Sequence, residues 1–268
     1  EVYKKYPDAR DIIHQIRQMS GAHASRILAF NVDAGALHKC DAVTGTNKSD
    51  QRRWSKVWFG FPHVGAGHKD EHRNVLANQL LILRFLISVA PYLTEGPLPE
   101  AIQGRKRRAA SEDDEDDEEP IEAADDEPDV SATSVPPRRQ GSVLITIRNV
   151  VPYTLWNIPM LGKRLRDVLQ PIAASAPSPP KGIRAPTVSD VDKNGAQYVL
   201  WRSFEFVPSN WPGYSHRRTV GFVEGLSTSH NEDLLRRPTQ PPQQGQPSGR
   251  HVGTGECRTY ELALQPVH

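Results

Sequence analysis

Apolar residues recur along this chain at two spacings, one typical of helices and one typical of buried strands. Helical spacing predicts helices over Pro7–Met19 and Lys69–Leu93, and the second carries a long apolar stripe. A further helix is expected directly after Pro152–Asn157, where apolar residues again recur every three or four positions. Each helix has one apolar face and therefore needs a second layer to cover it.

Short apolar runs bounded by turn residues predict the strands of that second layer. They are Arg26–Val32, Val57–Phe59, Gly141–Arg148, Tyr198–Val207, Thr219–Glu224 and Arg258–Leu264. Strands that alternate with helices indicate an α/β fold with a mostly parallel sheet. The last strands follow one another without a helix and indicate an antiparallel edge, a combination typical of the methyltransferase variant of the Rossmann architecture.

Polar and low-complexity segments interrupt this pattern in three places. Within one domain of residues 1–268 we expect a disordered acidic insertion at about 95–140, a Pro/Ala/Ser-rich loop at about 171–195 and a low-complexity linker at about 226–255. The acidic insertion also holds a basic cluster, Gly104–Arg108, and Ser111 ahead of eight consecutive acids. A nuclear import signal beside an acid-directed phosphorylation site would have this sequence, and so would a solvated spacer.

Charge is distributed unevenly along the chain. Glu112–Asp129 contains thirteen acids, and because the net charge is +1, the remaining residues together carry +14. A basic body with a separate acidic segment suits a nucleic-acid partner, although many solvated surfaces are also basic. The two cysteines, Cys40 and Cys257, lie far apart and indicate neither a disulfide framework nor a cysteine zinc site.

Apolar patterning gives no sign of a membrane partner. The longest apolar run, Leu80–Ala90, contains Arg84 and is too short to span a bilayer. No export leader is visible before the first helix, and the cysteine usage fits a reducing compartment. We therefore expect a protein without membrane contacts.

The stretch Lys56–Gly65 is the best candidate for a site. It passes from a strand directly into a turn that contains Phe61, Pro62 and His63, and ligands of open α/β sheets bind just past such strand ends. Asp33 follows the first expected strand in a similar position and could accept hydrogen bonds from a ligand. Both features also have ordinary structural explanations, namely a proline turn pinned by its histidine and an aspartate that caps a helix.

Other polar residues near this turn have a simpler interpretation. The group His68, Asp70, Glu71 and His72 has a spacing that matches no standard set of metal ligands, so we expect a solvated helix start and no metal. Asn78-Gln79 follows on the same expected helix. We expect this polar pair to tie the helix to the turn.

Five segments, in order and at matching spacing, carry a resemblance to a known family. They are Tyr6-Pro-Asp-Ala9, Asn31-Val-Asp-Ala-Gly-Ala-Leu-His38, Phe59-Gly-Phe-Pro-His-Val-Gly65 with Asn78-Gln79 downstream, Pro152-Tyr-Thr-Leu-Trp-Asn-Ile158 and Pro212-Gly-Tyr-Ser-His-Arg-Arg-Thr219. The chain resembles the eukaryotic ribosomal-RNA uridine-N3 methyltransferases, a Rossmann-like group that uses S-adenosyl-L-methionine. The resemblance covers residues 1–93, 141–169 and 198–224, with the acidic segment as an insertion.

The resemblance implies methyl transfer to N3 of a uridine in large-subunit rRNA. His63 would then accept the N3 proton as a general base, a role suited to a histidine that is mostly neutral at physiological pH. Phe61 would stack on the flipped-out base or flank the cofactor, and Pro62 would fix the turn between them. Beyond this, catalysis would consist of aligning the reacting atoms.

The same resemblance implies two sets of binding residues. The cofactor S-adenosyl-L-methionine would contact Asp33, Ala34, Gly60 and Phe61, with Asp33 on the adenine amine. The expected RNA contacts are Tyr153, Trp156, Tyr214, His216, Arg217 and Arg218. Trp156 is equally suited to the core, and the two arginines to an ordinary surface. The implied partner is rRNA or a pre-ribosome, and we expect a monomer in the nucleus and nucleolus, with the cytoplasm as the alternative.

Two departures from the family pattern bear on activity. The family's first strand and its Gly-x-Gly-Asp-Phe-Ser-Phe turn, which hold the methionine part of the cofactor, do not occur in this chain and are expected upstream of Glu1. Gly60 stands where the family usually has asparagine, so a side-chain amide is missing from the site. A second interpretation therefore stays open: a methyltransferase-like RNA-binding or ribosome-assembly protein without catalytic activity.

The acidic insertion yields a stability prediction. A segment with thirteen acids and few apolar residues cannot bury apolar area. Deleting Glu112–Asp129 should therefore shift the thermal unfolding midpoint by less than about 2 °C in a calorimetric scan. A large drop would show that the segment packs on the fold.

Overall fold

The protein is described by a computed structural model. It describes residues 3, 6, 8–20, 28–46, 51–65, 70–98, 139–179, 182–207, 210, 211, 214 and 257–266. The α-helices are α2 (Ala9–Ser20), α4 (Asp41–Thr44), α5 (Glu71–Val89), α7 (Ile158–Lys163), α8 (Leu165–Ser175) and α9 (Val188–Asn194), and the 3-10 helices are η2 (Ala34–Lys39), η4 (Ala90–Tyr92) and η5 (Tyr153–Trp156). The strands are β1 (Lys56–Gly60), β2 (Ser142–Arg148), β3 (Tyr198–Glu205) and β4 (Cys257–Leu264).

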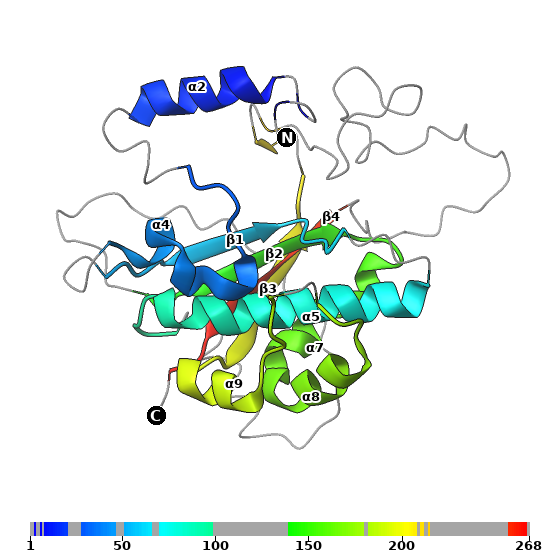
Figure 1. Cartoon of the computed structure of the whole chain (residues 1–268). Helices are drawn as coiled ribbons and strands as arrows, with labels where there is room; N and C mark the ends of the chain where they lie inside the picture. Colours follow the sequence, from blue (N-terminus) through cyan, green and yellow to red (C-terminus); the bar gives the residue numbers. More distant parts are fainter. Residues whose placement is uncertain are drawn as a thin grey trace, which may run out of the picture.

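The four described strands form one mixed sheet in the order β1-β2-β4-β3 (Figure 1). β1 and β2 are parallel, with Phe59 opposite Ile145, whereas β4 runs antiparallel to both β2 and β3. A bulge between Leu200 and Arg202 shifts the register of β3 against β4. β1 and β3 are therefore the two edges of the described sheet, and the expected antiparallel edge is confirmed.

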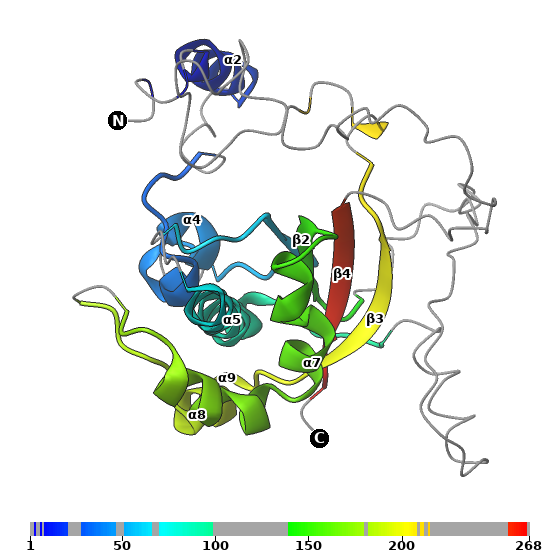
Figure 2. The ribbon, with the colours of Figure 1, turned by 90° about the vertical axis from the view of Figure 1, so that its right-hand side faces the viewer.

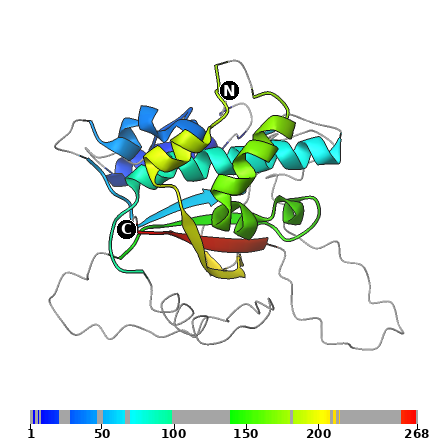
Figure 3. The same cartoon turned by 90° about the horizontal axis from the view of Figure 1, so that it is seen from below.

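The helices α5, α7, α8 and α9 lie on one side of the sheet (Figures 2 and 3). α5 is the centre of this layer, because its side chains from Ala77 to Val89 are almost all buried. The ring of Phe85 on α5 packs on Phe59 of β1, with centroids 4.6 Å apart. At the other edge, the Tyr198 hydroxyl donates to the Leu86 carbonyl over 2.7 Å, which satisfies a buried polar group.

α5 begins at a well-formed cap, since the Asp70 carboxylate accepts a hydrogen bond from the Arg73 amide over 2.8 Å. This agrees with the expected solvated helix start. By length and composition alone the segment Glu71–Tyr92 could cross a bilayer, with a mean hydropathy of 1.5. Inside the fold, however, 67% of that apolar window is buried, as in the central helix of a packed core.

The opposite face of the sheet carries a buried acid. The Glu261 side chain is fully buried, and its carboxylate accepts a hydrogen bond from the Ser142 hydroxyl over 2.6 Å. Two cations from the edge strands neutralise it, with Arg202 Nε at 2.8 Å and Lys56 Nζ at 3.2 Å. A buried carboxylate is tolerated only with such partners, so this cluster fixes the two edge strands to β4.

Most predicted elements are confirmed, including the helices expected over Pro7–Met19 and Lys69–Leu93. The strand expected over Arg26–Val32 is wrong for its described part, residues 28–32, which form no ladder. Asn31 adopts a left-handed conformation with φ 57°, which interrupts an extended backbone, and Phe30 is 49% exposed. Without this strand, parallel pairing is limited among the described strands to β1 and β2.

The loop expected over residues 171–195 is also partly helical. α8 continues through Pro171 to Ser175, and α9 follows with a capping box in which Thr187 and Asp190 satisfy each other's backbone amides. The Pro/Ala/Ser-rich composition hid these helices because a proline such as Pro171 usually marks the end of a helix, whereas α8 continues through it. Residues 99–138 of the acidic insertion, the strand expected over Thr219–Glu224 and the expected linker lie outside the described residues.

The Glu261 cluster can be tested by removing the charge alone. Glu261→Gln keeps the side-chain volume but loses the charged acceptor of two cations, so the free energy of unfolding should fall by about 2 kcal/mol in urea denaturation. Glu205→Gln, at the exposed end of β3, is the matched control and should change it by less than about 0.5 kcal/mol. Equal effects of the two substitutions would contradict a structural role for Glu261.

Candidate active site

The chain leaves β1 through a turn in an unusual backbone conformation. Phe61, the first residue after the strand, has φ 50°, a left-handed value that residues with a side chain seldom adopt. Its amide still donates to the Thr146 carbonyl over 2.8 Å, so the turn starts in register with β2. The next residue, Pro62, is buried and fixes the path that leads to His63. Strained positions of this kind are often found at functional sites.

Two buried amides on α5 hold this turn and the segment beside it. The Asn78 side chain accepts a hydrogen bond from the Val64 amide over 2.9 Å and donates to the carbonyl and side-chain oxygens of Asn74. Gln79 Nε2 donates to the carbonyls of Leu155 and Trp156 over 3.4 and 3.3 Å. The expectation that this polar pair ties the helix to the turn is therefore confirmed for Asn78, whereas Gln79 ties the helix to η5.

His63 lies between the turn and η5. Its Nδ1 accepts a hydrogen bond from the Gly65 amide over 2.8 Å, and Gly65 adopts a left-handed φ of 69° that allows this contact. The imidazole centroid is 6.2 Å from the ring of Trp156. Partial burial lowers the pKa of His63 below its usual 6.5, because it removes water that would stabilise the imidazolium. The lowered pKa favours the neutral imidazole.

The 3-10 helix η5 places two aromatic side chains, Tyr153 and Trp156, near His63. Trp156 is buried, with 1% of its surface exposed, and the Tyr153 ring meets it edge-on at 5.2 Å. The Arg148 guanidinium lies 5.7 Å from the Tyr153 ring, a cation–π contact. Of these two predicted RNA contacts, Tyr153 is partly accessible, whereas Trp156 belongs to the core. The Trp156 indole nitrogen is buried without a hydrogen-bond partner among the described residues.

The Phe61 side chain packs against a different set of aromatic rings from that of His63. Its side chain meets Phe206 edge-on at 6.0 Å, and Phe206 also contacts Trp58, Trp211 and Tyr214 at 5.7, 6.1 and 5.4 Å. Trp58 and Trp211 are 50% and 57% exposed. The structure thus brings the predicted RNA contact Tyr214 close to the predicted catalytic Phe61. The other predicted RNA contacts in this segment, His216, Arg217 and Arg218, lie outside the described residues.

Sequence reasoning missed the partners in this aromatic cluster. Trp58 on β1 and Phe206, directly after β3, come from opposite edges of the sheet, yet their ring centres lie 5.7 Å apart. The available signal was the density of aromatic residues in Tyr198–Tyr214, which indicated an unusual surface but not which rings would meet.

The Trp58 indole lies where a side chain at position 60 would project. The Trp58 indole donates to the Thr146 hydroxyl over 2.8 Å and thereby lies across the sheet towards Gly60. A Cβ atom at position 60 would approach this indole to 3.1 Å, closer than most real contacts. The missing side-chain amide is therefore linked to the large residue two positions earlier, because an asparagine at position 60 would require the indole to shift.

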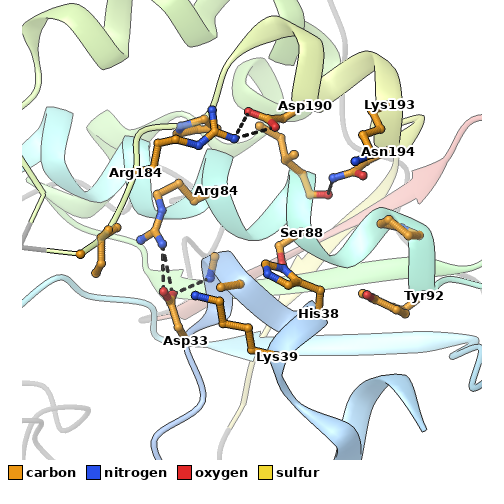
Figure 4. Close-up of a pocket in the computed structure, with 17 residues that line it drawn as sticks. Asp33, His38, Lys39, Arg84, Ser88, Tyr92, Arg184, Asp190, Lys193 and Asn194 are labelled. Atoms are coloured by element: carbon orange, nitrogen blue, oxygen red, sulfur yellow. Dashed lines mark hydrogen bonds and ion pairs between the residues drawn. The ribbon is translucent and has the colours of Figure 1, made fainter. Parts of the chain in front are cut away.

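Asp33 lies in a pocket of about 590 Å³ between η2, α5 and α9 (Figure 4). Its carboxylate accepts a hydrogen bond from the Gly35 amide over 2.8 Å, as a helix cap does, and forms an ion pair with Arg84 at 3.0 Å. The structural alternative considered for Asp33 is thus realised, while its side chain remains 38% exposed. Sequence reasoning missed Arg84, which lies 51 residues away in the chain.

The two predicted halves of the site lie at different levels of α5. Asn78, which holds the turn, and Arg84, which holds Asp33, are six residues apart, or about 9 Å along the helix axis. The described residues that line the pocket at Asp33 include none from the turn. Among the described residues no group of three or more His, Cys, Asp or Glu side chains could hold a metal ion.

A mixed α/β sheet with a strained turn at the end of a parallel strand is consistent with a methyltransferase-like protein. Residues 1–218, which contain every described part of this site, match the rRNA (uridine-N3-)-methyltransferase BTM5-like family, and the chain belongs to this family. The predicted resemblance is thereby confirmed.

A curated relative supports the same assignment. Over 202 residues the chain is 25% identical to the 25S rRNA (uridine(2634)-N(3))-methyltransferase of Saccharomyces cerevisiae, and the match covers 71% of this chain and 47% of the yeast protein. The chain thus spans about half the length of the curated relative it matches. No solved structure matches the chain at a significant level.

The role of Asn78 can be tested at a single amide. Asn78→Ala removes the acceptor of the Val64 amide, so hydrogen exchange at Val64 should accelerate roughly tenfold, while exchange at Phe61, whose amide bonds to β2, should change less. NMR-detected exchange measures both amides. Gln79→Ala is the control, since it releases η5 but not the turn, and unchanged exchange at Val64 in Asn78→Ala would contradict the assignment.

Proposed function

We propose that the protein transfers a methyl group from S-adenosyl-L-methionine to N3 of a uridine in large-subunit rRNA. The observation that carries this proposal is the family match over residues 1–218, which includes the turn from Gly60 to Gly65. The geometry supports it, because the turn lies at the carboxyl end of β1 and is held in place by Asn78. We further propose that the sheet is part of a Rossmann-like methyltransferase fold whose antiparallel edge is β4 and β3.

The residues at Asp33 fit the adenine end of the cofactor. A carboxylate offers about four acceptor directions, and the contacts to Gly35 and Arg84 leave capacity for an adenine amine at an accessible oxygen. The amide of the next residue, Ala34, has no hydrogen-bond partner among the described residues. At the other end, the Trp58 indole covers the side of Gly60 from which a Cβ would project, so Gly60 would meet the cofactor through its backbone groups. When bound, S-adenosyl-L-methionine supplies an electrophilic methyl group on a sulfonium.

The chain's own residues would then position the uracil for loss of its N3 proton. Phe61 offers a ring for stacking or for flanking the cofactor, and Pro62 holds the turn. His63 is the predicted general base, and its lowered pKa keeps it in the neutral form that this role needs. Holding the reacting atoms in line supplies much of the remaining acceleration.

RNA binding is proposed for the aromatic and basic residues beside the turn. Tyr153, with Arg148 against its ring, and Tyr214, in the aromatic cluster, are described and accessible enough to meet RNA. His216, Arg217 and Arg218 extend this proposal from the sequence alone. Together with the basic composition outside the acidic insertion, they suit rRNA or a pre-ribosome as partner. We also propose that the protein is a monomer and acts in the nucleus or nucleolus.

A second candidate is a non-catalytic RNA-binding or ribosome-assembly protein with the same fold. The observation that favours it is Gly60, which removes the amide that the family usually places next to the turn, together with the Trp58 indole that fills the adjacent space. An RNA-binding protein would keep the aromatic cluster around Phe206 without needing that amide.

Nucleoside analysis decides between the two. Loss of the gene should remove one 3-methyluridine from large-subunit rRNA, measured by mass spectrometry of digested rRNA, and the wild-type gene should restore it. A copy with Phe61→Ala should restore it poorly, because the ring beside the base is lost. If the 3-methyluridine content is unchanged while ribosome assembly is impaired, the protein is a binder and the enzymatic proposal is wrong.

A further inference from the structure

The hydrogen bond at His63 settles which of its nitrogens carries a proton. A neutral imidazole has one N–H donor and one acceptor nitrogen. Nδ1 accepts the Gly65 amide over 2.8 Å, so Nδ1 is the acceptor and Nε2 carries the hydrogen. The ring remains accessible to solvent. In the neutral ring the lone pair of Nδ1 is therefore engaged by Gly65, and Nε2 is an N–H group, not a free lone pair.

A second ring beside it also has an unused N–H. The Trp156 indole nitrogen is buried and has no acceptor among the described residues. A buried donor without an acceptor is costly, and such a group in a native fold calls for an explanation. The Trp156 carbonyl is bound by Gln79, so the residue is held in place while its N–H is left over. Its ring centre lies 6.2 Å from that of His63.

We propose that His63 Nε2–H and Trp156 Nε1–H are hydrogen-bond donors to the two carbonyl oxygens that flank N3 of the target uridine. This inference rests on the proposed function and deepens it. Uracil has an acceptor on each side of N3, and His63 and Trp156, with ring centres 6.2 Å apart, each carry one N–H that bonds to no described residue. The arrangement resembles an oxyanion hole, because it stabilises charge that develops during the reaction.

The chemical step follows from this arrangement. The N3–H bond breaks, its proton goes to water, and the electron pair left on N3 is shared with the two carbonyl oxygens, where the two donors stabilise it. The N3–C bond then forms as the S–C bond of the methyl donor breaks and leaves its electron pair on sulfur. His63 thereby lowers the cost of losing the proton instead of accepting it. To act as a base through Nε2, the ring would have to give up its bond to Gly65 or change tautomer.

The same two donors would select uridine over cytidine. Cytosine carries an amino group, itself a donor, in place of one carbonyl, so one N–H of the site would face another N–H and remain unpaired. The indole N–H is covered by protein, and the base reaches it only if neighbouring side chains move. Tyr153, edge-on to the indole at 5.2 Å, is the nearest ring that such a movement would displace.

The tautomer can be read without any cofactor. In the protein labelled with ¹⁵N-histidine, long-range ¹H–¹⁵N correlation spectra distinguish the two nitrogens, and His63→Ala identifies the signals by their disappearance. We expect the Nε2–H tautomer at pH 7.5. A Nδ1–H tautomer would overturn the inference whatever the activity of the protein.

Methyl transfer to an rRNA fragment tests the donor at His63. His63→Gln places an amide N–H₂ near the position of Nε2 but cannot act as a base, so it should keep kcat within about tenfold of wild type, whereas His63→Ala should lose about 100-fold. The exposed His72→Ala is the matched control and should change nothing. Equal losses in the Gln and Ala variants would overturn the donor role while wild-type transfer still upholds the proposed function.

The pH profile separates a donor from a base. A base loses activity as it becomes protonated, so kcat/KM would fall as pH decreases through the lowered pKa of His63. A donor keeps its N–H in the imidazolium, so the profile of wild type should show no histidine-dependent fall that His63→Gln lacks. A fall present in wild type and absent from His63→Gln would assign the base role and overturn the inference.

Trp156→Phe tests the second donor, because it keeps a ring and removes the N–H. Losing an unpaired buried donor should leave the thermal midpoint unchanged or raise it, while kcat falls about tenfold and discrimination against cytidine weakens. The control is Trp54→Phe, whose indole donates to the Val43 carbonyl over 2.9 Å and whose loss should lower the midpoint without affecting kcat. A Trp156→Phe protein with full activity and unchanged base selectivity would overturn the role of Trp156.

Discussion

The candidate site depends on one buried constraint, the pair of side-chain amides that α5 projects from its third turn. Asn78 holds the turn after β1, and the next residue, Gln79, holds the carbonyls of η5. Both amides are buried in a helix whose remaining length forms the core. Because they are adjacent on one rigid element, the turn and η5 cannot move independently, and this places the rings of His63 and Trp156 side by side.

This constraint couples the chemistry to the packing of the whole sheet. The helix that carries the amides is itself held by Phe59 of β1 and by the hydroxyl of Tyr198 on the opposite edge strand. On the other face, the carboxylate of Glu261 links the same two edge strands through Lys56 and Arg202. A substitution that displaces α5 therefore also displaces the Asn78 acceptor of the Val64 amide, next to His63.

The sequence is enough to predict local elements, but it does not reveal contacts between residues that are far apart in the chain. Apolar periodicity is enough to predict β1, β2, β3, β4 and α5, and the Asn78-Gln79 pair is expected as polar residues on the helix that tie it to the turn. The strand expected before Asp33 failed at Asn31, whose left-handed backbone no periodicity reveals. Arg84 beside Asp33 and Phe206 beside Trp58 come from distant parts of the chain, so a pattern read along the sequence could not pair them.

The mutual crowding of Gly60 and Trp58 has a consequence for how this chain can change. An asparagine at position 60 must share space with an indole that is anchored to Thr146, so the substitution is unfavourable while the tryptophan remains. A smaller residue at position 58 removes that obstacle, and asparagine at position 60 then becomes acceptable. The effect of each substitution on stability thus depends on the residue at the other position. Asparagine at position 60 is tolerated only after position 58 has become smaller, so a chain that keeps Trp58 also keeps Gly60.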